Sequence, residues 1–119
     1  MEEVLLILII THFVSDWLFQ PGKWAVKKTK SFKYRLLHVI QYTILFVPVL
    51  YLLEINLLWL IWIFLTHLFI DSYKFVEFWN KKVRNRGEET PNWVLITQDQ
   101  ILHILVLIPL ILKIPIDFL

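Results

Sequence analysis

The sequence predicts an all-α protein, a four-helix transmembrane bundle made of two pseudo-repeated helical hairpins. The first reason is composition: 58% of the 119 residues are hydrophobic and the mean hydropathy is +0.64, whereas soluble chains contain roughly 45–50% apolar residues. The second is that the apolar residues gather in four long stretches. The third is that Lys and Arg gather in two of the connections between them. We expect a single integral membrane domain over 1–119, because this length suits one domain.

Each apolar stretch is close to the roughly 20 residues that cross a bilayer as a helix. Glu2 and Glu3 stand where a signal peptide would be positive, so we expect the first stretch to be a mature helix. It ends at Pro21–Gly22, because these residues stop helices. Pro48 lies inside the second stretch, and membrane helices tolerate proline. We predict spans at about 4–20, 34–53, 57–79 and 92–113.

The basic residues predict how the helices cross the membrane. The first connection contains Lys23, Lys27, Lys28, Lys30, Lys33 and Arg35, and the third contains Lys81, Lys82, Arg84 and Arg86. The short turn at Glu54–Asn56 contains neither Lys nor Arg. By the positive-inside rule, both basic connections face the cytoplasm and both termini lie outside. The net charge is only +2 and its clustering is explained by topology, so we expect no nucleic-acid partner.

One phrase, Thr-His-x-x-x-Asp, occurs twice, at 11–16 in the first stretch and at 66–71 in the third. On a helix, residues i and i+4 lie about 40° apart on one face. Each copy is therefore expected to aim one imidazole and one carboxylate at the same point. Asp99 and His103 repeat the spacing in reverse order in the fourth stretch, and His38 lies in the second. The two hairpins thus match as an internal repeat.

These His and Asp side chains fall at one depth in the predicted bundle. At 1.5 Å rise per residue they lie roughly 4–18 Å from the cytoplasmic helix ends, and the outer half holds almost nothing ionisable. An Asp at the centre of a spanning helix costs roughly 2.5–3.5 kcal/mol on insertion scales. Hydrogen bonds between helices are one interpretation of what offsets this cost. Matched pairs at one depth favour the other interpretation, a bound metal.

The chain has no Cys, so a metal must bind through His and carboxylates. These ligands suit zinc, which we expect first, with manganese or iron as alternatives, and we expect one or two divalent ions. The candidate ligands are His12, Asp16, His38, His67, Asp71, Asp99 and His103. In one division His12, Asp16 and His38 hold one ion, and His67, Asp71 and His103 hold the other. Ligand sets that cross between the hairpins are equally compatible with the sequence.

Two residues are candidates for catalysis. Asp99 lies one helical turn from His103 and is expected to bridge ions or to act as general base to a metal-bound water. Lys74 lies seven residues after His67, about 20° off its axis line on the same helix face, where a cation would meet a phosphate oxygen. The alternative for Lys74 is to extend to the cytoplasmic surface.

The combined pattern resembles a family of bacterial and phage membrane proteins, the domain of unknown function 3307 (DUF3307). The residues that carry the resemblance are His12-x-x-x-Asp16-Trp17-x-x-Gln20, then Lys27 or Lys28, His38, Thr66-His67-x-x-Ile70-Asp71-x-x-Lys74 and Asp99-Gln100-x-x-His103. More distantly, the His-x-x-x-Asp helices resemble an inner-membrane family described as metal-dependent hydrolases, and their ligand spacing is similar to that of helical zinc-dependent phospholipases C. The resemblance implies a multi-pass protein of the bacterial cytoplasmic membrane.

These observations lead to a metal-dependent hydrolase as the first functional hypothesis. Its site would open to the cytoplasmic leaflet, and its substrate would be a phosphoester or a phospholipid headgroup. A proton or metal-ion transporter or channel subunit is the second hypothesis, because Asp and His chains inside membranes also form ion pathways. The third is a structural membrane partner that the metal holds together. The bilayer is the expected partner, and a homo-oligomer is compatible with the sequence.

Overall fold

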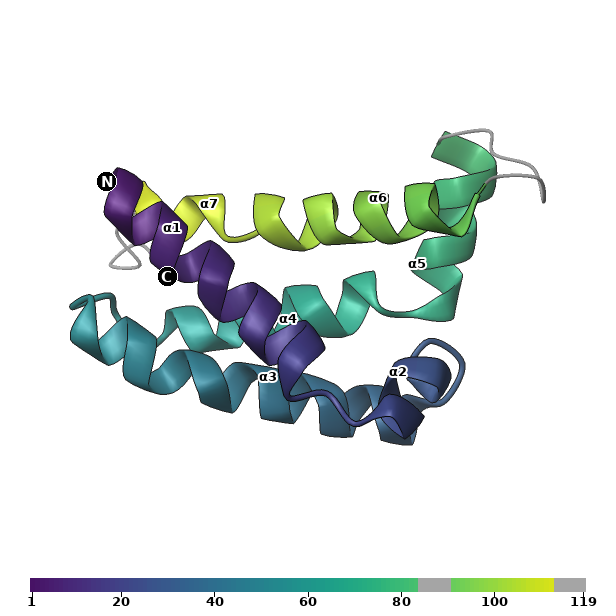
Figure 1. Cartoon of the computed structure of the whole chain (residues 1–119), viewed down its shortest axis with the longest axis horizontal. Helices are drawn as coiled ribbons and strands as arrows, with labels where there is room; N and C mark the ends of the chain where they lie inside the picture. Colours follow the sequence, from purple (N-terminus) through teal and green to yellow (C-terminus); the bar gives the residue numbers. More distant parts are fainter. Residues whose placement is uncertain (84–90, 113–119) are drawn as a thin grey trace.

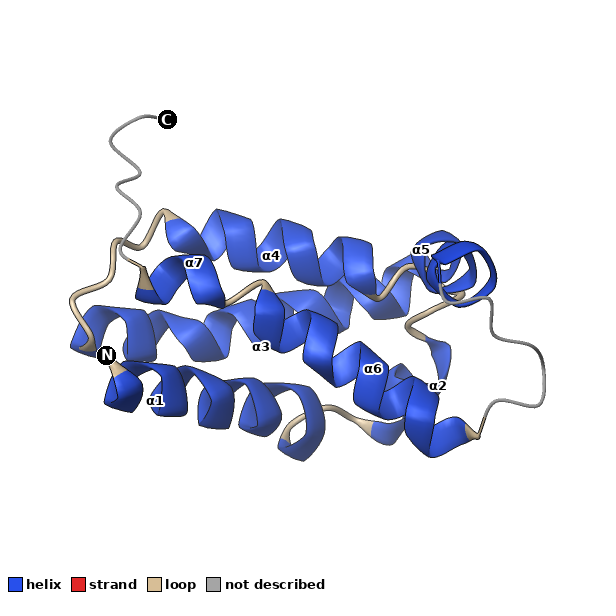
Figure 2. Cartoon of the chain, turned by 90° about the horizontal axis from the view of Figure 1, so that it is seen from above, coloured by secondary structure: helices blue, strands red, loops and turns tan. Residues whose placement is uncertain are grey.

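The computed structural model describes residues 1–83 and 91–112, and the described chain is all-α (Figures 1 and 2). The predicted span end at 113, Arg84 and Arg86 lie outside the described residues. The helical elements of the described chain are α1 (Glu2–Phe13), the π-helical turn η1 (Val14–Leu18), α2 (Gly22–Lys27), α3 (Phe32–Leu52), α4 (Trp59–Ile70), α5 (Tyr73–Phe78), the π-helical turn η2 (Trp79–Val83), α6 (Asn92–Leu105) and α7 (Ile108–Ile111).

The helices α1, α3, α4 and α6 run along the long axis of a body 43 × 28 × 27 Å in extent (Figures 1 and 2). The N-terminus, the turn between α3 and α4, and α7 lie at one end, which we call the apolar end. α2, the residues 28–31 that follow it, α5 and η2 lie at the other, which we call the basic end. Both described basic connections therefore lie at the same end, as the sequence predicts.

Within residues 1–83 and 91–112, two helices are long and apolar enough to cross a membrane, Phe32–Leu52 and Trp93–Ile111. A third span exists if Trp59–Ile70 and Tyr73–Lys82, which meet at 61°, are counted together. The bend has a local cause: the Ser72 hydroxyl accepts a hydrogen bond from the Phe75 N–H and starts a new helix after Asp71. The predicted continuous span at 57–79 is thus two helices in the structure.

The last helix also breaks, between α6 and α7. Pro109 has no N–H to donate to the carbonyl of Leu105, so the α-helical ladder is interrupted there. The carbonyl of Val106, at the break, accepts a hydrogen bond of 2.7 Å from the indole of Trp62. Membrane helices require that such freed backbone groups find a partner inside the protein.

The end of α3 is a Schellman motif. The Ile55 N–H donates to the carbonyl of Leu50 and the Glu54 N–H donates to the carbonyl of Tyr51, at 2.9 and 3.2 Å. Glu54 adopts φ 55°, in the left-handed region that this motif requires. Ile55 and Leu50 both belong to the buried core of the apolar end. This motif reverses the chain into α4.

The interior changes in character along the bundle, whereas the outside does not. At the apolar end the core is formed by Leu8, Tyr42, Phe46, Leu50, Ile55, Ile63, Leu107 and Leu110. Further toward the basic end the buried side chains are His and Asp. On the outside, residues two positions from each buried His are large, apolar and exposed: Ile10 53%, Ile40 41%, Leu65 55% and Ile101 52%. A polar interior inside an apolar surface suits a lipid surrounding.

Candidate metal centre

The two Thr-His-x-x-x-Asp phrases end at two different breaks in helical geometry. His67 and Asp71 lie on the last turn of α4, and their Nε2 and Oδ2 atoms are 3.1 Å apart. This pair matches the expected i, i+4 geometry. His12 lies in α1, but Asp16 lies in the π-helical turn η1. A π-turn holds more residues than an α-turn, which rotates Asp16 away from the position an α-helix would give it.

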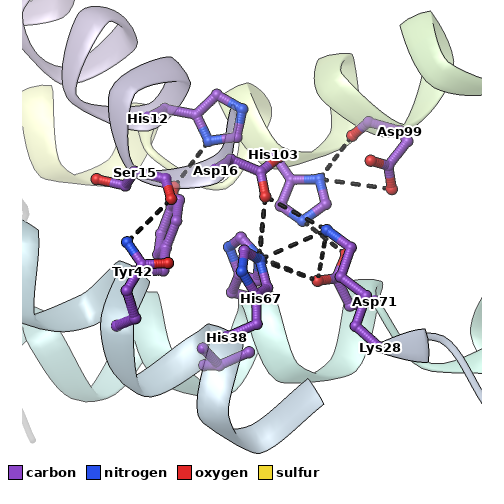
Figure 3. A network of polar contacts seen from close by, with 12 residues as sticks. His12, Ser15, Asp16, Lys28, His38, Tyr42, His67, Asp71, Asp99 and His103 are labelled. Atoms are coloured by element: carbon purple, nitrogen blue, oxygen red, sulfur yellow. Dashed lines mark hydrogen bonds and ion pairs between the residues drawn. The ribbon is translucent and has the colours of Figure 1, made fainter. Parts of the chain in front are cut away.

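The rotation places Asp16 beside the histidines of the other helices (Figure 3). Its Oδ1 lies 3.0 Å from Nε2 of His38 and 3.9 Å from Nε2 of His67. Those two nitrogens are 2.9 Å apart. Asp71 Oδ2 lies 3.4 Å from His38 Nε2 as well as 3.1 Å from His67 Nε2. We call Asp16, His38, His67 and Asp71 the His–Asp cluster; all four side chains are buried.

The His–Asp cluster brings together more lone pairs than hydrogen atoms. His38 Nε2 has the two carboxylate oxygens and the nitrogen of His67 within 3.4 Å, yet an imidazole nitrogen carries at most one hydrogen. The Nδ1 atoms of His38 and His67 are buried and have no hydrogen-bond partner in the described structure. A shared cation is one partner that satisfies such a set of converging lone pairs.

Lys28 supplies one cation. From the residues that follow α2, its Nζ lies 3.3 Å from Asp16 Oδ1, 3.2 Å from Asp71 Oδ2 and 3.5 Å from His38 Nε2. Burial lowers the pKa of this amine, but Asp71, Asp16 and Asp99 raise it more, so the pKa of Lys28 lies above its ordinary value. Two carboxylates and one ammonium still leave one net negative charge in a buried place. Binding of a divalent ion would change this net charge from negative to positive.

A second layer of contacts orients Asp16. The amide of Gln100 donates to Asp16 Oδ2 at 3.0 Å, and its carbonyl oxygen accepts a hydrogen bond of 2.7 Å from His12 Nε2. His12 Nδ1 then accepts from the Tyr42 hydroxyl at 2.8 Å. Both ring nitrogens of His12 are therefore occupied. Such outer partners fix the orientation of metal ligands.

His103 faces the His–Asp cluster from α6. Its Nδ1–H donates to the backbone carbonyl of Asp99 at 2.7 Å, and its Nε2 lies 3.3 Å from Asp71 Oδ1. Two overlapping triads have ligand atoms within 4.8 Å of one another: Asp16, His38 and His67 form one, and His67, Asp71 and His103 form the other. The second coincides with a ligand set that the sequence suggested.

A family model described as "Protein of unknown function (DUF3307)" matches residues 4–117. The chain belongs to the DUF3307 family. No curated protein and no solved structure matches the chain.

In this DUF3307 protein the predicted ligands divide into two groups. Five of the seven lie in the two triads, namely Asp16, His38, His67, Asp71 and His103. His12 lies behind Gln100, and Asp99 lies beside His103 with its side chain 32% exposed. Lys74 is exposed and lines a separate hollow at the basic end, while Lys28 holds the position between the carboxylates.

Two residues of the DUF3307 site escape prediction from spacing. Tyr42 lies one helical turn after His38 and looks like an ordinary apolar-face residue of α3, although its hydroxyl contacts His12. Lys28 is one of a run of basic residues, which the positive-inside rule already explains. Its position in the family pattern, given only as Lys27 or Lys28, was the one signal that singled it out.

Proposed function

We propose that this chain is an integral membrane metalloprotein that binds one divalent transition-metal ion in the His–Asp cluster. Zinc is the first choice for this His and carboxylate donor set, and manganese or iron are compatible with it. The buried His/Asp triads support this proposal, as does the net negative charge that Lys28 leaves uncompensated.

The observation that carries the proposal is the shape of the cluster. Metal bonds of about 2.0–2.1 Å at tetrahedral angles put ligand atoms about 3.3–3.4 Å apart. Five of the six separations between Asp16 Oδ1, His38 Nε2, His67 Nε2 and Asp71 Oδ2 are 2.9, 3.0, 3.1, 3.4 and 3.9 Å. These four atoms come from two helices, α3 and α4 with its C-cap residue, and from the π-turn η1, so the fold assembles a set of ligand atoms that no single segment could form.

One ion per chain follows from the overlap of the triads. Both triads contain His67, and its Nε2 is the atom that faces His38 and Asp71. One nitrogen lone pair binds one ion. His103 Nε2 then pairs with the other oxygen of Asp71, Oδ1, at 3.3 Å, and binds no second ion.

We propose that α1 with η1, α3, the bent pair α4–α5 and α6 with α7 make four crossings of the bacterial cytoplasmic membrane. The apolar outer surface and the polar interior support this arrangement. The location of the described basic residues at one end supports cytoplasmic connections and external termini. The metal site then lies in the cytoplasmic half of the bilayer.

We propose further that the site hydrolyses a phosphoester. A bound divalent ion polarises a phosphoryl oxygen and lowers the pKa of a bound water. The water oxygen bonds to phosphorus, the phosphorus–oxygen ester bond breaks, and the departing alkoxide takes up the proton that the water gave away. Asp99 is the proposed general base, because its side chain is partly exposed and lies beside His103. With a divalent ion present, Lys28 gives the site a net positive charge that attracts a phosphate.

A structural site is the second candidate, and one observation favours it. Asp71 Oδ2 completes four protein ligands, whereas catalytic zinc sites usually keep the fourth position for water. Transport has less support, since the described core of the apolar end is made of apolar side chains and one tyrosine, with no ionisable chain leading outward.

The test is turnover by metal-loaded protein on a panel of soluble phosphoesters and phospholipids. We expect wild type to turn over a phosphoester and Asp99→Asn to lose about 10²-fold or more while keeping its metal, as for a lost general base. Glu77→Gln is the control, because Glu77 pairs with Lys81 away from the cluster. A metal-replete wild type without turnover on the panel supports the structural site instead.

A further inference from the structure

A hollow of about 660 Å³ opens at the basic end, outside the His–Asp cluster. It lies where the end of α4, the start of α5, the residues after α2 and the first turn of α3 meet. The residues that line it are Thr29, Lys30, Arg35, Phe69, Ser72, Tyr73, Lys74, Phe75 and Phe78. The lining contains three cations and no carboxylate, so its charge favours binding of an anion.

The three cations come from three different segments, namely Lys30 from the turn before α3, Arg35 from α3 and Lys74 from α5. Arg35 is held in place, because its Nη1 donates to the backbone carbonyl of Thr29 at 3.2 Å. Its Nε is buried and has no hydrogen-bond partner in the described structure. A guanidinium with a spare donor, flanked by two ammonium groups, suits a phosphate oxygen.

The aromatic residues of the hollow indicate that the anion belongs to a lipid. Phe69, Tyr73, Phe75 and Phe78 line it, and Phe69 and Phe78 are more than half exposed. Aromatic rings beside Lys and Arg are typical of the headgroup level of a bilayer. α5 bends by 61° from α4 at this level (Figure 2). A small soluble anion needs the cations but not this apolar wall.

The hollow shares a wall with the metal centre. The Tyr73 N–H donates to the carbonyl of Thr29 at 3.0 Å, which ties the start of α5 to the residues after α2. Thr29, which lines the hollow, follows Lys28 in the chain, and Ser72, which also lines it, follows Asp71. Each of these two backbone segments therefore places one residue at the cluster and the next residue at the hollow. The hollow and the cluster are therefore connected along the backbone at Lys28–Thr29 and Asp71–Ser72.

We propose that this hollow binds the phosphate of an anionic phospholipid and that such a lipid is the substrate of the metal centre. The substrate assignment rests on the proposed function; the binding of the lipid does not. Lys30, Arg35 and Lys74 hold the headgroup, and the aromatic wall holds the start of its acyl chains.

The experiment measures lipid binding to the full chain by native mass spectrometry from detergent, with phosphatidylglycerol and phosphatidylcholine of equal chain length. The double variant Lys30→Ala with Lys74→Ala removes two cations of the hollow. The matched control, Lys23→Ala with Lys82→Ala, removes two exposed cations of the same end that do not line it. Inorganic phosphate is added as a competitor in a separate arm.

We expect wild type to prefer phosphatidylglycerol, and the hollow variant to bind it about tenfold more weakly than the control does, the loss of roughly one charge-assisted contact. Equal weakening in both variants would show a diffuse surface charge and overturn the proposal. Full displacement of the lipid by millimolar inorganic phosphate would overturn the lipid assignment in favour of a free anion.

Asp71→Asn separates this proposal from the proposed function. It removes a ligand of the metal centre but no residue of the hollow, so lipid binding should persist while metal and turnover are lost. Lipid binding without any turnover by metal-loaded wild type would refute the substrate assignment and the hydrolase while leaving the lipid site in place. Loss of selective lipid binding in Asp71→Asn would contradict the separate hollow.

Discussion

At the scale of single residues, the charge of the candidate metal centre depends on the ammonium group of Lys28. It lies 3.2–3.3 Å from an oxygen of each cluster carboxylate and occupies space that a metal ion would approach. A lysine in this position offsets the repulsion between the two buried carboxylates when no ion is bound. If the cluster binds metal as proposed, this ammonium repels the arriving cation, so the same residue is expected to stabilise the cluster without an ion and to lower its affinity for one.

Replacing Lys28 should therefore tighten metal binding. At an effective dielectric of about 20, two unit charges 4 Å apart interact by about 4 kcal/mol, so a gain of at least tenfold in zinc affinity is expected for Lys28→Met. Competition with a chelator of known affinity measures it. Lys23→Met, which removes an exposed charge near the Tyr34 ring, should leave affinity unchanged. An unchanged affinity in Lys28→Met would mean that the ammonium does not oppose the ion.

Gln100 is expected to act through Asp16 rather than on the metal directly. Its amide joins Asp16 Oδ2 to His12, so Gln100→Ala frees the carboxylate to rotate. Loss of an outer partner typically weakens metal binding by about 10–100-fold. The same chelator competition measures the effect, with Gln98→Ala as control because Gln98 contacts Asn80 instead. Equal affinities in the two variants would remove Gln100 from the site.

At the scale of elements, the candidate metal centre is formed at breaks in helices. The π-turn η1 rotates Asp16 toward α3 and α4, and the bend after α4 leaves Asp71 at a helix end. Spacing alone predicted the pair His67–Asp71, because it lies within ordinary α-helical geometry. It did not predict the partnership of Asp16 with His38 and His67, since no residue at 14–18 signals a π-turn. The sequence predicted that His12 and Asp16 point at the same place. In the structure they are instead connected by two hydrogen bonds through the side chain of Gln100.

The turn after α3 offers a test of the backbone geometry. Glu54 has φ 55°, which costs a non-glycine residue roughly 1–2 kcal/mol, and glycine is the usual residue at this place in a Schellman motif. Glu54→Gly should therefore stabilise the protein by about 1 kcal/mol and raise Tm in detergent by a few degrees. Asn56→Gly should not, because the Asn56 side chain accepts from the Leu58 N–H. A lower Tm for Glu54→Gly would contradict a left-handed Glu54.

At the scale of the whole molecule, hydropathy predicted the helical class and the approximate position of each long helix in the sequence. Apolar stretches of this length satisfy their backbone groups in lipid by forming helices. Hydropathy did not predict the helix breaks at Ser72 and Pro109. The first depends on the Ser72 cap, and the second on the Trp62 indole that hydrogen-bonds the Val106 carbonyl. The four-crossing arrangement remains a proposal, with two helices long and apolar enough, and a third if the bent pair is one span.

Topology is testable with single cysteines, because the chain has none of its own. Asn56→Cys places an exposed thiol at the apolar end, and Lys33→Cys places one at the basic end. A membrane-impermeant thiol reagent should label Asn56→Cys in intact cells, and should label Lys33→Cys only after the cells are permeabilised. The opposite labelling pattern would place the basic end, and with it the metal centre, on the outer side.

The central claim is that the His–Asp cluster binds one metal ion, and elemental mass spectrometry of purified protein tests it most directly. Wild type prepared without chelator should contain one divalent transition-metal ion per chain. His67→Ala should contain none, because His67 belongs to both triads, whereas Thr66→Ala, changed at the neighbouring residue, should keep the full amount. A wild type free of transition metal, or a His67→Ala variant with undiminished metal, would contradict the account.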